Sequence, residues 1–159
     1  LLNRTSSMSR KWFDNKVPNY EKRASKNELE DYAKIAVENY LHNFDIYKLD
    51  LAANEVLSLA IKTNLYLNDN QPWMLIKKKE NFPLVKEIIY NVLESTRIIG
   101  LLLLPLLPEL SSRINEQLGS LYREEIPWVK QLSWGLLVVN SSLPKPTPII
   151  NKLEYDKNL

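Results

Sequence analysis

The sequence predicts an all-α fold, an antiparallel bundle of about five helices with an irregular C-terminal tail. Apolar residues recur at spacings of three and four through most of the chain, which is typical of amphipathic helices. Prolines and turn-forming residues interrupt this pattern at short intervals, which favours antiparallel neighbours with short connections. A length of 159 residues, 45% of them hydrophobic, is sufficient for one domain with a core. We assign residues 1–120 to the bundle and residues 121–159 to a C-terminal extension of the same domain.

The first three helices are predicted over residues 1–13, 27–44 and about 47–67. Pro18 follows the first helix and prevents its continuation. Asn27 can cap the second helix, because its side chain can accept a hydrogen bond from the first turn. The third helix is predicted to bury a stripe made of Leu49, Ala53, Val56, Ala60, Thr63 and Leu67.

The second half of the chain contains the clearest stop and start signals. The polar residues 68–70 favour a turn, and Pro72 suits the first turn of a short helix that reaches about residue 79. A long helix is predicted from residue 83 until Pro105 stops it. Another helix follows over residues 108–119, where a glycine occupies the position at which a left-handed residue ends helices.

The composition argues against catalysis in this chain. No cysteine is present, which excludes disulfides and thiolate zinc sites, and three glycines cannot form a phosphate-binding loop. The single histidine, His42, has no plausible nucleophile at a known spacing, so we interpret it as a structural residue. Carboxylates are expected on polar helix faces, and the adjacent pair Glu124–Glu125 would point apart on a helix. We therefore predict no catalytic residue and no metal site.

The run "IIGLLLLPLLPEL" is too short to span a membrane and is broken by Pro105 and Pro108, so we interpret it as a buried core helix. No secretory signal is visible, and the lack of cysteine fits a reducing compartment. We therefore expect a cytoplasmic protein without a membrane partner. The chain opens on an already periodic segment, which indicates that it is part of a larger protein.

Charge is distributed unevenly although the whole chain carries only +2. Residues 1–26 contain seven basic and two acidic side chains, a net +5, whereas residues 27–71 contain three lysines and eight acids, a net −5. The lysines of residues 77–79 follow Trp73, which stands directly after a turn. Cations beside an aromatic ring favour single-stranded RNA binding, although a solvated basic face is the simpler alternative. Trp73 alone could also be a staple at the start of its helix.

Four segments resemble one known family. "NLYLNDNQPWMLIK" resembles the signature of the anticodon-binding helical domain of class I methionyl-tRNA synthetases, in which an N-x-Y pair leads into a turn and a Pro-Trp. "LLNRTSSMSRKWF" is similar to the first helix of that domain, and "LLLLPLLPELSSRINEQLG" to its fourth helix, proline break and fifth helix. "PKPTPIINKLE" is similar to its terminal segment. Together they cover nearly the whole chain in the family's order.

The resemblance implies that Arg4 and Trp73 contact the CAU anticodon. Asn64 and Pro72 would support them from the helix and turn that precede the tryptophan. The family also uses an asparagine, which would lie one position before Leu1. Arginine offers a planar fork of donors to a base edge or a phosphate, and tryptophan offers a face on which a base can stack. Trp12, Trp128 and Trp134 are interpreted as core or interface residues.

The resemblance also implies the partners. The domain would read the anticodon loop of tRNA(Met) within an enzyme that joins methionine to tRNA, and DNA is not an expected partner. ATP would bind in a catalytic domain that is not in this chain, so no cofactor is expected here. Residues 121–159 would pack toward that catalytic domain, although Ile150, Asn151 and Lys152 depart from the family's pattern.

Two alternatives remain open at the level of sequence. The chain could be the anticodon-binding domain of another class I synthetase, for isoleucine, valine or leucine, since those enzymes share the bundle. It could instead be a helical protein-interaction module that does not bind RNA.

Overall fold

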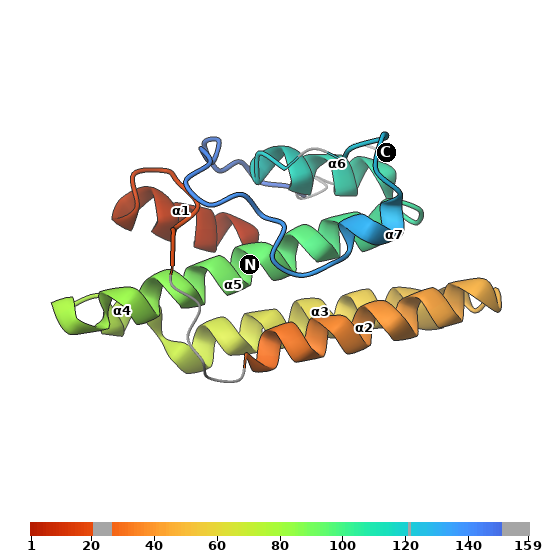
Figure 1. Cartoon of the computed structure of the whole chain (residues 1–159), viewed down its shortest axis with the longest axis horizontal. Helices are drawn as coiled ribbons and strands as arrows, with labels where there is room; N and C mark the ends of the chain where they lie inside the picture. Colours follow the sequence, from red (N-terminus) through yellow and green to blue (C-terminus); the bar gives the residue numbers. More distant parts are fainter. Residues whose placement is uncertain (21–26, 121, 151–159) are drawn as a thin grey trace, which may run out of the picture.

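The computed structural model describes residues 1–20, 27–120 and 122–150, and it confirms the all-α class (Figure 1). The elements are α1 (Leu2–Trp12), α2 (Glu28–Asp45), α3 (Leu49–Asn70), the short α4 (Pro72–Leu75), the 3-10 turn η1 (Lys79–Asn81), α5 (Phe82–Leu103), α6 (Pro108–Gln117) and the short α7 (Trp128–Gln131). Within these ranges the only β pairing is an isolated bridge between Lys16 and Ser142.

The local signals at the helix ends act as the sequence predicts. The side chain of Asn27 accepts a hydrogen bond of 3.3 Å from the backbone N–H of Glu30 and caps α2. α5 ends two residues before Pro105, and Pro108 opens α6. Gly119 follows α6 with a φ of +62°, the left-handed backbone that glycine tolerates best.

α5 is the central helix, with α2 and α3 on one side and α1 and α6 on the other (Figure 1). Every residue from Ile88 to Leu102 is buried, so the helix has no solvent face over that length. The first five residues of the run that resembled a membrane segment, Ile98–Leu102, therefore lie in the core, whereas residues 103–110 are half-buried or exposed. Among the helices that the structure describes, none is both long enough and apolar enough to cross a membrane.

The buried stripe of α3 lies in a different register from the predicted one. Its buried residues are Ala52, Val56, Leu59, Thr63 and Leu67, whereas Leu49, Ala53 and Ala60 are exposed or half-buried. Both sets recur at spacings of three and four, so periodicity alone cannot separate them. Packing selects the first set because α3 must face α2 and α5 together.

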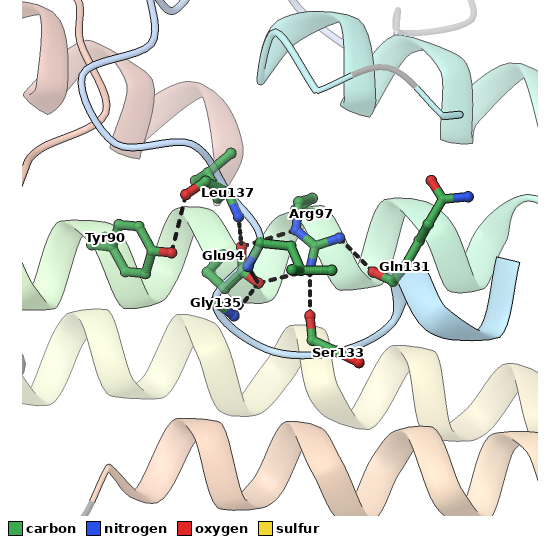
Figure 2. Close-up of polar contacts among 8 residues, drawn as sticks. Tyr90, Glu94, Arg97, Gln131, Ser133, Gly135 and Leu137 are labelled. Carbon is green, nitrogen blue, oxygen red and sulfur yellow. Dashed lines mark hydrogen bonds and ion pairs between the residues drawn. The ribbon is translucent and has the colours of Figure 1, made fainter. Parts of the chain in front are cut away.

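The segment Trp128–Ile150, which we call the return segment, is anchored at residues 131–137 by a buried ion pair in α5 (Figure 2). The guanidinium of Arg97 donates to both carboxylate oxygens of Glu94, at 2.9 and 2.7 Å, and to the carbonyl oxygens of Gln131 and Ser133. The Glu94 carboxylate in turn accepts the backbone N–H groups of residues 135–137. Carboxylates were expected on polar faces, so this expectation is wrong for Glu94, whose side chain is fully buried.

The described part of the predicted extension is therefore built into the bundle. Besides the Glu94–Arg97 contacts, Tyr90 donates its hydroxyl to the carbonyl of Leu137, and the Trp128 indole N–H donates to the carbonyl of Leu101. Trp12, Trp128 and Trp134 all pack half-buried against the core, as the sequence predicts. Packing on a catalytic domain stays a prediction, and the divergent residues 151 and 152 lie outside the described residues.

Candidate nucleic-acid interface

Arg4 and Trp73 lie together where α1, α3 and α4 meet. The Cζ atom of Arg4 is 4.5 Å from the centroid of the indole ring, within the range of a cation–π contact. Arg4 Nη1 also donates a hydrogen bond of 2.9 Å to Oδ1 of Asn68 in the last turn of α3. Arg4 is exposed, whereas Trp73 and Asn68 are half-buried. The three side chains form a flat cationic and aromatic surface, which we call the Arg4–Trp73 platform.

A short backbone reversal places Trp73 on this surface. α3 continues to Asn70, three residues beyond the predicted end, and the reversal falls on Gln71, whose backbone is left-handed with φ 43° and ψ 58°. Pro72 is buried and opens α4, where its fixed φ suits the first helical position. The backbone N–H of Met74 then donates to the carbonyl of Gln71 at 2.8 Å. These constraints hold the tryptophan at the edge of the core rather than inside it.

Three of the four buried residues of α1 are small and polar. Leu2, Thr5, Ser6 and Ser9 are buried. The Ser9 hydroxyl donates to the carbonyl of Lys16 at 2.6 Å, so this polar side chain is satisfied inside the protein. Arg4 lies outside this buried face and can lay its long side chain across the indole.

A polar network fixes the last turns of α3, which support the platform. The amide of Asn91 in α5 donates to the Tyr66 hydroxyl at 3.1 Å and accepts a hydrogen bond from Asn27. The Asn70 side chain donates to the carbonyl of Tyr66 at 2.8 Å. Burial raises the pKa of Tyr66, although the hydrogen bond from Asn91 lowers it in part, so the phenol stays neutral at physiological pH.

The supporting residues differ in part from those predicted. Asn64 is exposed, and among the described residues no hydrogen bond joins it to Arg4 or Trp73. Asn68, one helical turn farther along α3, makes that contact instead. The sequence could have indicated Asn68, because residues 64 and 68 share one helix face. The polar cluster around Asn68 is instead typical of a turn, which led to the prediction that the helix ends before it.

The other candidate residues do not form a site. His42 is exposed in the last turn of α2, at the end of the bundle opposite α4 (Figure 1). Glu124 and Glu125 are both exposed, so neither has the burial that tunes a catalytic carboxylate. Over residues 1–20, 27–120 and 122–150, no three histidine, aspartate or glutamate side chains are grouped closely enough to hold a metal ion.

Comparison with known proteins identifies the family. Residues 17–157 match the family described as the anticodon binding domain of methionyl tRNA ligase, a range that includes Trp73 but not Arg4. The chain is 34% identical to the methionine–tRNA ligase of Thermosynechococcus vestitus over 96% of its own length and 30% of the relative. It is 30% identical to the Listeria monocytogenes ligase over 98% of its own length and 24% of that relative. It therefore spans less than a third of these curated relatives.

A solved structure shares the fold. The free-state methionyl-tRNA synthetase of Mycobacterium tuberculosis superposes with a TM-score of 0.80 over 97% of this chain and 31% of its own, at 24% identity. The matched family is that of the methionyl enzymes and not that of the isoleucyl, valyl or leucyl enzymes, which the sequence left open. The chain belongs to the family of anticodon-binding domains of methionyl-tRNA ligases.

Proposed function

We propose that this chain binds the anticodon loop of tRNA(Met) and reads the CAU triplet through the Arg4–Trp73 platform. The whole ligase would join methionine to that tRNA with ATP bound in its catalytic domain, outside this chain. RNA rather than DNA is the partner, because an anticodon loop presents unpaired bases that can leave the stack. The contact between Arg4 and Trp73 is the observation that carries the proposal.

The platform offers two kinds of contact to an unstacked base. Guanidinium planes and aromatic rings are both surfaces on which unpaired bases stack, and here one covers the other. The guanidinium carries five N–H donors, and Oδ1 of Asn68 accepts from one of them. The donors that remain can reach the acceptors of a cytosine edge or a phosphate oxygen.

Order in the free protein lowers the cost of binding. Asn68 holds the guanidinium, and the buried Pro72 fixes the backbone from which the indole extends. Side chains that already occupy their bound positions lose little conformational entropy when the ligand arrives.

Lysines beside the platform supply attraction without sequence information. Lys77, Lys78 and Lys79 are all exposed directly after α4, and Arg10 and Lys11 are exposed on α1. Contacts from such side chains to phosphates raise affinity and orient the RNA, but they do not distinguish bases.

The test compares RNA hairpins that differ only in the anticodon. We expect the chain to bind a CAU hairpin more tightly than a GAU hairpin in fluorescence anisotropy, and Arg4→Ala or Trp73→Ala to remove most of that preference. Lys48→Ala and Tyr47→Asn serve as controls, since both residues are exposed at the far end of the bundle. Asparagine suits the left-handed backbone of Tyr47, whose φ is 61°.

Two results would count against the proposal. A preference for any anticodon other than CAU would assign the chain to a different tRNA. Negligible RNA affinity at low salt, unchanged by both substitutions, would favour a protein-interaction module instead.

A further inference from the structure

A cavity with aromatic walls lies at the same end of the bundle as the platform and has no role in the function proposed above. It has a volume of about 460 Å³ and lies between the last turn of α1 and the first turn of α5. Its lining consists of Trp12, Ile76, Lys79 and Phe82. Two of these four side chains are aromatic and one is cationic, a composition that suits a flat anionic ligand.

The aromatic walls are held in place from behind. Phe13 packs edge-on against Trp12, with ring centroids 6.5 Å apart, and against Phe82 at 5.6 Å. The Phe82 side chain remains 38% exposed, so its outer side is accessible to a ligand. Phe13 thus ties α1 to the start of α5 and fixes the separation of the two walls.

Positive charge surrounds the cavity. Lys86 places its Nζ atom 5.2 Å from the Phe82 centroid, and Lys79, which lines the cavity, is exposed. Lys77 and Lys78 are exposed just before Lys79, while the acids nearest in the sequence to the residues around the cavity are Asp14, Glu80 and Glu87. A ligand that carries a phosphate beside a flat ring matches this arrangement better than an apolar peptide does.

The cavity and the platform share two parts of the chain, α1 and the segment that runs from α4 to η1. On α1, Arg4 and Trp12 are eight residues apart, about 12 Å along the helix axis at about 1.5 Å per residue. On the other side, Trp73 lies in α4 and Ile76 directly follows that helix. One RNA loop can therefore reach both places.

We propose that this cavity binds a second unpaired base of the same RNA loop, from a nucleotide outside the CAU triplet. The base stacks against Trp12 and Phe82, and its phosphate lies near Lys79. This inference rests on the proposed function, since the platform brings the loop to this end of the bundle. Stacking tolerates any base, so the cavity contributes affinity but does not discriminate anticodons.

The test combines Trp12→Leu with RNA hairpins that lack single bases. Leucine keeps apolar volume in this half-buried position but has no π-face. We expect Trp12→Leu to weaken binding about tenfold for the CAU and the GAU hairpin alike, which leaves their ratio unchanged. Trp12→Phe should retain most of the affinity. Removing one base outside the triplet, as an abasic nucleotide, should abolish the difference between wild type and Trp12→Leu.

A second variant keeps the test decisive if Trp12→Leu does not fold. Lys79→Ala changes an exposed side chain, and we expect it to lower the magnitude of the slope of log affinity against log salt by about 0.7, the loss of one phosphate contact to a single strand. The matched control is Lys48→Ala, because Lys48 lies between α2 and α3, far from the cavity. Gln71→Ala would be a poor control, because the backbone of Gln71 is left-handed.

The outcomes separate this inference from the proposed function. Wild-type RNA affinity for Trp12→Leu and Lys79→Ala, together with a loss for Trp73→Leu, would overturn the cavity's role and leave the platform intact. A loss for Trp12→Leu that persists with every abasic hairpin would also overturn it, because the tryptophan would then act through packing. If the wild-type chain binds the CAU hairpin no more tightly than the GAU hairpin, the proposed function itself is overturned.

Discussion

The guanidinium of Arg4 lies 4.5 Å from the centroid of the Trp73 indole, although the first belongs to α1 and the second to α4. The contact joins the two residues that the family resemblance singles out. It arises because the start of α1 reaches the last turn of α3 and because a left-handed residue, Gln71, redirects the chain before Pro72. A cation and an aromatic ring from distant parts of the sequence thereby become one surface.

Replacing Arg4 by lysine should separate charge from shape. Lysine keeps the positive charge but lacks the planar fork and stacks less well on the indole. We expect Arg4→Lys to retain the salt dependence of RNA binding and to lose about 1–3 kcal/mol of discrimination between CAU and a one-base variant. Anisotropy titrations at two salt concentrations measure both quantities. Full discrimination in Arg4→Lys would show that the fork is not used.

Asn68 and Asn64 form a matched pair of substitutions on one face of α3. Because Asn68 holds the Arg4 guanidinium at 2.9 Å, we expect Asn68→Ala to weaken binding of the CAU hairpin by about 0.5–1.5 kcal/mol. Asn64→Ala, one turn earlier and exposed, should have the smaller effect. Titration of both variants with one hairpin gives the comparison. A larger loss for Asn64→Ala would restore the role that the sequence suggests for it.

The buried pair Glu94–Arg97 should dominate the stability of the return segment. Glu94→Gln leaves a buried cation without its counter-charge, and we expect the free energy of unfolding to fall by about 3–5 kcal/mol. Glu109→Gln is the control, since its contact with Arg113 is exposed and 3.8 Å long, and should change stability by less than about 1 kcal/mol. Urea unfolding followed by circular dichroism measures both. Equal effects would contradict the structural role of the buried pair.

The hydroxyl of Tyr40 is buried, and no partner for it exists among the described residues. Removing an unsatisfied hydroxyl relieves a desolvation penalty, so Tyr40→Phe should raise stability at neutral pH by up to about 1 kcal/mol. A drop of more than about 1 kcal/mol in urea unfolding would show that the hydroxyl has a partner.

Alkaline pH gives a second measurement on Tyr40. Burial raises the pKa of its phenol from 10.0 to about 12, so the unfolded chain loses this proton first. Ionisation of Tyr40 therefore leaves the free energy of unfolding unchanged below pH 10 and lowers it as pH rises from 10 toward 12. Tyr40→Phe should lose less stability than wild type across that window, although burial also raises the pKa of Tyr66 and Tyr90 and part of the decline will remain.

Gly100 in α5 packs closely against α6. A Cβ atom at this position would lie 2.9 Å from Cγ2 of Ile114 and about as close to the amide of Asn115. We expect Gly100→Ala to destabilise the chain by about 1–3 kcal/mol, despite the better helix propensity of alanine. Thermal unfolding measures this effect. Ala53→Gly, on an exposed helix face, is the control that measures the difference in helix propensity between alanine and glycine. Gly135→Ala would be a poor control, because the φ of Gly135 is +89°.

The elements that the sequence predicts correctly are those with local causes. Asn27 caps, Pro105 stops and Gly119 ends a helix through interactions within a few residues. The position of Trp73 just after a turn could be predicted for the same reason, because Pro72 acts on the backbone directly beside it. Such signals need no knowledge of the rest of the fold.

The features that sequence reasoning missed depend on distant partners. Glu94 sits in an apolar helix, and its partners are backbone groups of residues 135–137, which no periodic pattern predicts. Asn68 contacts Arg4 only because the fold brings the start of α1 to the last turn of α3, which lies 64 residues away in the sequence. The register of α3 likewise depends on which neighbours pack against it, not on spacing alone.

The most direct test of the central claim is a double-mutant cycle on Arg4 and Trp73, measured as affinity for the CAU hairpin. If the two side chains act as one platform, their effects are coupled, and Arg4→Ala/Trp73→Ala should bind little more weakly than either single variant. Losses that simply add would contradict the account, because the two residues would then contact the RNA independently.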